Sequence, residues 1–189
     1  MAGDNRTVYI ILGLLSHEPM SGYDMKKRIN VSISRFWDVG FGQLYPTLKR
    51  LEANGMIVGA GEHNSGRPDR RVYSITGRGR LALRRWLAET ASKEYVRYEI
   101  LLKLFFGSLA GREASIATIE AFRARYAGAA DLMQVYVDDL RRVLPDSPDH
   151  LYYLLTVMFG QRVYKAYLDW AAEALELLGT RPSRGGDLP

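Results

Sequence analysis

The stretch that decides the fold runs GQLYPTLKRLEANGMI over residues 42–57 and predicts a short helix with two different faces. Leu44, Leu48 and Leu51 follow the i, i+4, i+7 spacing that forms one apolar stripe along a helix. The opposite face collects polar, cationic and aromatic side chains, which are Gln43, Pro46, Lys49 and Arg50 with Tyr45 on the flank. Because such an outward face suits a groove of nucleic acid, we expect a recognition helix.

Both ends of this helix are marked in the sequence. Pro46 is compatible with a helix only in the first turn, where its missing N–H is not needed, so the helix is expected to start near Gly42. Asn54-Gly55 predicts the C-terminal end, because glycine readily adopts the left-handed conformation that closes many helices. The exposed polar groups therefore lie toward the N-terminal end of the helix, as they do in helices that enter the major groove.

Two helices are expected before the recognition helix. Apolar spacing predicts the first over residues 7–16. The second is expected over residues 22–30, because Ser21 followed three positions later by Asp24 forms a variant capping box.

A β-hairpin is expected after the recognition helix. Residues 56–59 and 71–75 are β-type runs, and the polar segment 60–70 between them contains the turn formers glycine and proline together with two arginines. Thr76-Gly77 then opens another helix. Three helices followed by a hairpin with a basic tip are the element order of a winged helix-turn-helix.

The C-terminal half is expected to be helical throughout, starting at residue 91. Apolar spacing predicts a helix over 95–109 and a long one over 112–144, and Ser147 is a plausible N-cap for a last helix that ends near residue 178. At about 1.5 Å per residue these long helices exceed what one small domain can bury. We therefore expect part of the last helix to pack against a second copy of the chain, since helix-turn-helix proteins usually dimerise.

The resulting expectation is a mainly α protein with three parts. Residues 1–90 would form a winged helix-turn-helix DNA-binding domain with a two-stranded wing. Residues 91–178 would form an all-α dimerisation and effector domain, and residues 179–189 would be a disordered tail rich in Gly, Pro and Arg.

Charge and composition narrow the possible partners. Residues 1–90 contain 14 Lys and Arg against 8 Asp and Glu, whereas residues 91–189 contain 12 against 13, so the N-terminal half is the part expected to meet a polyanion. The absence of cysteine excludes disulfides, zinc–cysteine sites and thiol catalysis. No stretch approaches the roughly 20 apolar residues that span a bilayer, and no signal-peptide layout is present, so we expect a cytoplasmic protein with no membrane partner.

Two motifs are specific in combination, LYP at residues 44–46 and GRP at residues 66–68. Together with ILGLL at 11–15, PMSGY at 19–23 and RRVYSIT at 70–76, they resemble the PadR family of bacterial transcriptional regulators. The helical C-terminal half resembles, by layout, the dimerisation domain of the longer PadR subfamily. The resemblance implies a homodimeric, ligand-responsive repressor that binds a pseudo-palindromic operator in double-stranded DNA.

The resemblance also implies roles for individual residues. Gln43, Tyr45, Pro46 and Lys49 would enter or flank the major groove together with Thr47 and Arg50, Tyr23 and Lys26 would hold phosphates, and Arg67, Arg70 and Arg71 would place the wing on the DNA backbone or minor groove. Most of these contacts would give affinity and register without sequence information. Gln43 is the best candidate for reading a base edge, because its amide can form two hydrogen bonds with adenine.

Members of the family commonly sense small molecules, which directs attention to aromatic residues of the C-terminal helices. The candidates for effector binding are Phe105, Tyr164, Tyr167 and Trp170, and the expected effector is a planar hydrophobic compound such as a phenolic acid. Aromatic residues at helical spacing also serve as ordinary core or dimer interface, and that interpretation stays open.

An enzyme is not expected, and neither is a cofactor or a metal. His17, His63 and His150 lie far apart and lack metal-ligand spacing. The run GRGRLA at 77–82 imitates a dinucleotide fingerprint, but no second parallel strand follows it. The alternatives that remain are a transcriptional activator or co-regulator of the same fold, and a winged helix that contacts only proteins.

Overall fold

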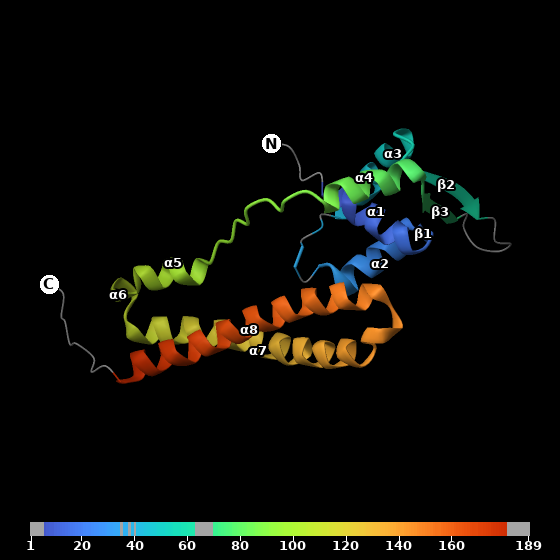
Figure 1. Cartoon of the computed structure of the whole chain (residues 1–189). Coiled ribbons are helices and arrows are strands. Elements are labelled where there is room, and N and C mark those ends of the chain that lie inside the picture. The colour runs from blue at the N-terminus through green and yellow to red at the C-terminus, as the bar shows by residue number, and fades with distance from the viewer. Residues whose placement is uncertain (1–5, 35, 38, 40, 63–69, 181–189) are drawn as a thin grey trace. The chain divides into compact units, whose positions relative to one another are not determined.

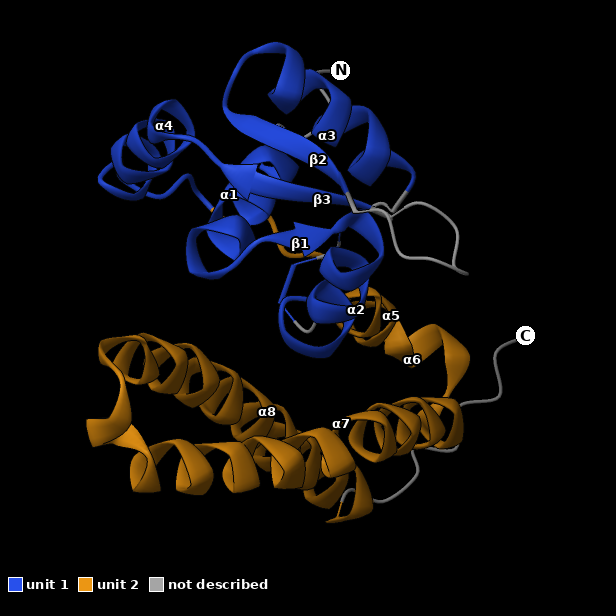
Figure 2. Cartoon of the chain, turned by 90° about the vertical axis from the view of Figure 1, so that its right-hand side faces the viewer, with its two compact units in different colours: residues 1–93 blue, residues 94–189 orange. Residues whose placement is uncertain are grey.

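The structure is a computed structural model, and it describes residues 6–34, 36–37, 39, 41–62 and 70–180. The chain divides into two compact units, residues 1–93 and residues 94–189 (Figure 2). The fold is mainly helical with an N-terminal winged helix-turn-helix, which confirms the expected fold class. None of the helices in the described ranges combines the length and the hydropathy needed to cross a membrane.

The N-terminal unit contains five helical segments and three strands in its described part (Figure 1). In chain order they are α1 (Thr7–His17), β1 (Met20–Ser21), α2 (Gly22–Ser32), the 3-10 turn η1 (Phe41–Gln43), α3 (Leu44–Ala53), β2 (Ile57–Glu62), β3 (Arg70–Ile75) and α4 (Gly77–Leu87). The strands form an antiparallel sheet in the order β1-β3-β2. The strand β1 was not expected from the sequence, and it adds two residues to the free edge of the hairpin.

The local start and stop signals of the helices are confirmed. Ser21 and Asp24 form the capping box, in which the Ser21 hydroxyl accepts a hydrogen bond from the Asp24 N–H at 3.2 Å and the Asp24 carboxylate accepts one from the Ser21 N–H at 3.3 Å. Gly55 adopts the left-handed conformation after α3, with φ of 64°. Thr76 caps α4 by accepting a hydrogen bond from the Gly79 N–H at 3.2 Å.

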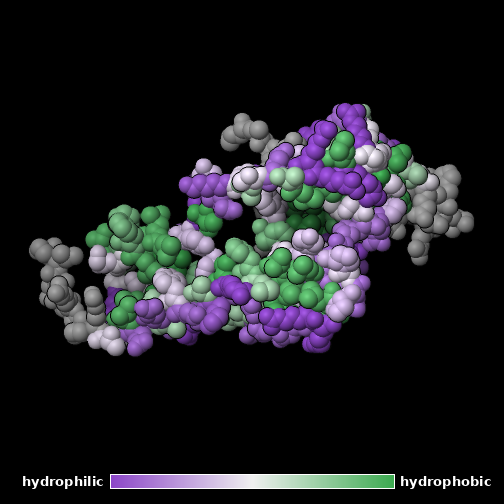
Figure 3. Space-filling model, viewed as in Figure 1, coloured by the Kyte–Doolittle hydropathy of each residue, from purple (hydrophilic) through white to green (hydrophobic). Residues whose placement is uncertain are grey.

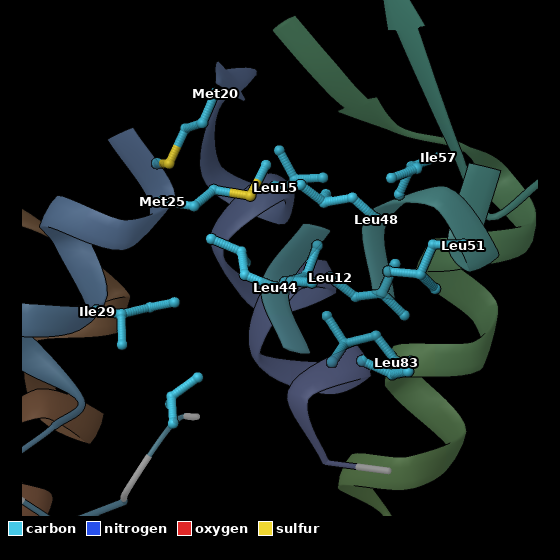
Figure 4. Packing of buried hydrophobic residues seen from close by; sticks show 13 residues of the cluster. Leu12, Leu15, Met20, Met25, Ile29, Leu44, Leu48, Leu51, Ile57 and Leu83 are labelled. Carbon is cyan, nitrogen blue, oxygen red and sulfur yellow. The ribbon is translucent and has the colours of Figure 1, made fainter. Parts of the chain in front are cut away.

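The core of the N-terminal unit lies between α1, α2, α3 and α4 (Figure 4). Leu44, Leu48 and Leu51 are buried together, which confirms the apolar stripe of the recognition helix. They pack with residues that the other elements contribute, including Ile11, Leu12, Leu15, Met25, Ile29, Ile57 and Leu83. Complete burial of one such side chain stabilises a fold by about 1.5–3 kcal/mol, so this cluster holds α3 firmly in place. The opposite face of α3 stays exposed to solvent.

The C-terminal unit is built on two long helices joined by a short turn. Its elements are α5 (Glu99–Phe105), α6 (Gly107–Ala110), α7 (Arg112–Arg142), η2 (Leu144–Asp146) and α8 (Pro148–Thr180). The helices α7 and α8 pack against each other as an antiparallel pair (Figure 1). The expected N-cap is confirmed, because the Ser147 hydroxyl accepts a hydrogen bond from the Asp149 N–H at 3.3 Å.

Three expectations for the C-terminal half were wrong in detail. Residues 90–98 have no regular structure, so helicity does not begin at residue 91. The helix expected over 95–109 begins at Glu99 and is interrupted at Phe106, whose φ of −103° and ψ of 15° leave the α region. Tyrosine and valine before Glu99 are poor helix formers, and a prediction made from apolar spacing alone does not take this low propensity into account. The helix α8 also includes Gly179 and Thr180, while residues 181–189 of the expected tail lie outside the described residues.

Candidate nucleic-acid interface

The outer face of α3 and η1 carries the side chains expected to meet DNA. Gln43, Pro46, Lys49 and Arg50 are exposed, and Tyr45 has 60% of its surface accessible. Pro46 is the third residue of α3, so its missing N–H lies in the first turn as expected. This face is therefore polar, cationic and aromatic, and the buried leucines of the opposite face hold it in place.

Thr47 does not belong to this outer face, and the expectation that it contacts DNA was wrong. Its exposed fraction is only 4%. Thr47 lies three positions after Leu44 and one before Leu48, so helical geometry turns it toward the core. The spacing of Thr47 relative to Leu44 and Leu48 already indicated burial, whereas its polar side chain favoured the surface.

The first turn of α2 adjoins the first turn of α3. A Cβ atom on Gly22 would lie 2.8 Å from Cε1 of Tyr45, so the tyrosine ring packs directly over this glycine. The neighbouring Tyr23 is 71% exposed, and Lys26 is exposed one turn further along α2. The two tyrosines thus provide an aromatic surface where both helices begin.

The wing arginines have different outcomes. Arg67 lies outside the described residues, and of Arg70 the structure describes only the backbone, which pairs with Glu62 at the end of the hairpin. The side chain of Arg71 is exposed, and its Nη2 atom lies 2.6 Å from Oε1 of Glu52 in α3. Arg71 therefore connects the wing with the recognition helix, a contact that the sequence analysis did not predict.

The ion pair shifts the pKa of both partners. The hydrogen bond from Arg71 lowers the pKa of the Glu52 carboxyl below its ordinary value of 4.5, and the N–H of Gly59 also stabilises the carboxylate. Glu52 raises the pKa of Arg71 in return. Both groups therefore stay charged at neutral pH.

Three of the four candidate effector residues meet in one aromatic cluster of the C-terminal unit. Tyr164, Tyr167 and Trp170 of α8 lie against Phe122 and Tyr126 of α7, with ring centroids 5.5 Å apart for Phe122 and Trp170 and 5.7 Å apart for Tyr126 and Tyr164. Phe105 is not part of this cluster, because it is 82% exposed and its ring meets that of Phe106 edge to face, with ring centroids 5.1 Å apart. The structure therefore brings together three of the four candidates and leaves Phe105, the last residue of α5, outside the cluster.

Tyr98 joins the cluster through a hydrogen bond that the sequence analysis missed. Its hydroxyl lies 2.7 Å from the hydroxyl of Tyr167, and the two rings meet edge to face. Partial burial, together with this hydrogen bond, raises the pKa of Tyr167. The cluster therefore contains two phenol hydroxyls that are already hydrogen-bonded to each other.

Metal-ligating and charged side chains are the other candidates for a site in the described part of the chain. Within the described ranges, no group of three or more His, Asp or Glu side chains is arranged to hold a metal ion. The charged residues that gather in the N-terminal unit are mostly basic and lie on exposed helix faces.

The fold and the exposed face of α3 together define a winged helix-turn-helix protein with a helical C-terminal unit. Residues 11–85 match the model of the transcriptional regulator PadR-like family, and residues 96–179 match that of the virulence activator alpha C-terminal region. The negative transcriptional regulator PadR of Bacillus subtilis is 30% identical over 175 residues, which cover 90% of this chain and 96% of that protein. The chain belongs to the PadR-like family of transcriptional regulators, and it is a DNA-binding regulator rather than an enzyme.

Solved structures show the same architecture. Bacillus subtilis PadR in complex with operator DNA has a TM-score of 0.79 and 26% identity, and the match covers 90% of this chain and 98% of that one. The same protein in complex with p-coumaric acid has a TM-score of 0.76 over 95% of this chain and all of that one, also at 26% identity. The Vibrio cholerae virulence activator AphA is 25% identical, with a TM-score of 0.58 and coverage of 92% and 98%.

Proposed function

We propose that this protein is a ligand-responsive repressor that acts in the cytoplasm and binds a pseudo-palindromic operator as a homodimer. The observation that carries the proposal is the exposed outer face of η1 and α3, where Gln43, Tyr45 and Lys49 project into solvent while the other face of α3 is buried. Lys49 supplies attraction to phosphates, and Gln43 supplies an amide that can read a base edge.

Exposed apolar surface supports the homodimer. On the face shown in Figure 3, hydrophobic surface gathers over α5 and α6 and over the first half of α8. The large exposed residues of these segments include Leu101, Leu102, Phe105, Phe106 and Leu109, and Leu151, Tyr152, Tyr153, Leu155 and Phe159. Surface of this kind is costly to leave in water, and a second copy of the chain would cover it. A dimer would present two α3 helices to successive major grooves about 34 Å apart.

Two features support repression and a planar effector. The Bacillus subtilis relative is a negative regulator, and its structures hold operator DNA and p-coumaric acid. In this chain the aromatic cluster around Tyr167 offers ring faces and two phenol hydroxyls, which suit a planar compound that carries a phenol or a carboxylate. We therefore place the effector at the cluster of Tyr164, Tyr167 and Trp170.

Activation is the second candidate. It is favoured by the match of residues 96–179 to the virulence activator C-terminal region and by the likeness to AphA. Repressor and activator would use the same DNA-binding face, so the two differ in where the operator lies and not in how it is bound.

A mobility-shift titration with the region upstream of the protein's own gene tests the proposal. We expect a dimer-sized complex whose affinity falls about 10³-fold or more between roughly 50 and 200 mM salt, because cationic contacts release counterions. Addition of p-coumaric acid should release the DNA, and a reporter gene should become active in cells that lack the protein. Salt-insensitive binding would contradict DNA recognition, and reduced reporter activity in those cells would favour the activator.

A further inference from the structure

Glu52 is an unexpected residue for a helix that meets DNA. It is the only acidic side chain in α3, and it follows Lys49 and Arg50 on a helix that the proposed function places against phosphates. A carboxylate near a polyanion weakens binding through Coulomb repulsion. A second property of Glu52 must therefore account for its position.

That property is a pair of hydrogen bonds to the wing. Oε1 of Glu52 accepts one from the Gly59 N–H of β2 at 2.9 Å and one from Nη2 of Arg71 in β3 at 2.6 Å. A single carboxylate oxygen of the recognition helix thus binds both strands of the hairpin. Charge-assisted hydrogen bonds of this length are about twice as strong as neutral ones.

Neighbouring residues leave space for this contact and support it. A Cβ atom on Gly59 would lie 2.5 Å from Nε of Arg71 and 2.8 Å from Oε1 of Glu52, so only glycine leaves room for the pair. The guanidinium carbon of Arg71 lies 5.8 Å from the centroid of the Tyr73 ring, which supports it from within the same strand. The glycine, the ring and the carboxylate together fix the direction of the Arg71 side chain.

We propose that Glu52 and Arg71 are positioning residues that hold the wing at a fixed angle to the recognition helix, and that Arg71 acts on DNA binding through Glu52 and not through a phosphate. The inference rests on the proposed binding of DNA by α3. It replaces the role of phosphate contact that the sequence resemblance implied for Arg71, and it assigns a role to Glu52.

For the removal of the Glu52 carboxylate, the proposal predicts a change in DNA affinity opposite to the one that simple electrostatics predicts. Glu52→Ala removes a negative charge near DNA, so charge alone would tighten binding. If Glu52 positions the wing, the same change weakens binding, by about tenfold for the loss of charge-assisted hydrogen bonds. Glu52→Gln keeps an acceptor for the Gly59 N–H and should restore part of the affinity.

The experiment is a double-mutant cycle on the full-length protein. The probes are a 30-base-pair duplex selected from a random pool by the wild-type protein and a random duplex of the same length. Wild type, Glu52→Ala, Arg71→Ala and the double variant are titrated with each probe at several salt concentrations. Lys49→Ala, alone and combined with Glu52→Ala, is the matched control for a residue expected to contact phosphate.

We expect Glu52→Ala to bind more weakly than wild type and Arg71→Ala to cost little further affinity in the Glu52→Ala background. Lys49→Ala should add its full effect in both backgrounds and reduce the salt slope by about 0.9. Unchanged or tighter binding by Glu52→Ala, or additive effects of the Glu52 and Arg71 substitutions, would overturn the proposal.

Amide hydrogen exchange separates this inference from the proposed function. Exchange at Gly59 should accelerate in Glu52→Ala, because its N–H loses its acceptor. If the wild-type protein fails to bind DNA in a salt-dependent manner, the proposed function is wrong, whereas unchanged exchange at Gly59 contradicts the wing contact itself.

Discussion

The ring of Tyr45 rests on Gly22, where a Cβ atom would lie 2.8 Å from Cε1 and 3.3 Å from Cζ of the tyrosine. Gly22 does not have a positive φ, so its backbone would tolerate alanine. Room for the aromatic ring, and not conformational freedom, is therefore the reason for glycine at this position. The contact sets the direction of a side chain on the exposed outer face of α3.

Gly22→Ala is expected to weaken DNA binding without unfolding the protein. The added methyl group would push the Tyr45 ring away from α2, and a loss of about 1.4 kcal/mol of binding free energy would appear as a tenfold rise in Kd. Mobility-shift titration measures the affinity, and circular dichroism measures the melting temperature. Gly13→Ala is the matched control, because a Cβ atom there meets nothing within 4 Å. Equal affinities of the two variants would show that the contribution of Tyr45 to DNA binding does not depend on the space left by Gly22.

Gln43 and Lys49 are expected to differ in what their loss changes. Gln43→Ala should relax the base preference at one position of each half-site by about 1–3 kcal/mol, because an amide discriminates between base edges. Lys49→Ala should weaken binding to all sequences alike, since phosphate contacts carry no base information. Selection of binding sites from a random pool with each variant distinguishes the two. An unchanged consensus for Gln43→Ala would exclude it from base reading.

Gly79 should be intolerant of substitution for reasons of packing. A Cβ atom on this residue of α4 would lie 2.2 Å from the carbonyl oxygen of Met56, a backbone atom that cannot turn aside. Gly79→Ala should therefore reduce the free energy of unfolding by about 1–3 kcal/mol in urea titrations. Gly77→Ala, two residues earlier at the start of the same helix, meets nothing within 4 Å and should leave stability unchanged or slightly raised.

The ion pair of Glu52 predicts a dependence of stability on pH. Because its pKa in the folded protein is lower than the ordinary 4.5, the unfolded chain binds the proton more readily. The stabilising contribution is complete above that ordinary value and is lost as the pH falls through the lowered pKa. In urea titrations from about pH 6 to about pH 3, the difference in unfolding free energy between wild type and Glu52→Gln should shrink. A difference independent of pH would contradict the assignment.

Those parts of the fold that depend on neighbours in the chain could be predicted. The capping box of Ser21, the left-handed Gly55 and the cap at Thr76 are local signals, and each appears at the expected residue. The strand β1 could not be predicted, because its two residues become a strand only by pairing with Tyr73 and Val72 some 50 residues later.

In the candidate site, too, features set by neighbouring residues could be predicted, whereas contacts between distant residues could not. The outer face of α3 follows from helical periodicity, whereas the contact of Glu52 with Arg71 joins residues 19 positions apart and depends on the angle of the hairpin. Thr47 shows a different limit, because its spacing indicated burial while its polar side chain favoured the surface. The hydroxyl pair of Tyr98 and Tyr167 lies across 69 positions and has no local signal.

The buried face and the exposed face of α3 consist of different side chains. This separation affects how the operator specificity of such regulators can change in evolution. Leu44, Leu48 and Leu51 hold the helix in the core, while Gln43, Pro46 and Lys49 remain in solvent. Substitutions among the solvent residues leave the buried residues untouched, so a duplicated gene can acquire a new operator without first losing a folded protein. The same property makes residues 43, 46 and 49 the natural positions to randomise when a regulator of chosen specificity is engineered on this scaffold.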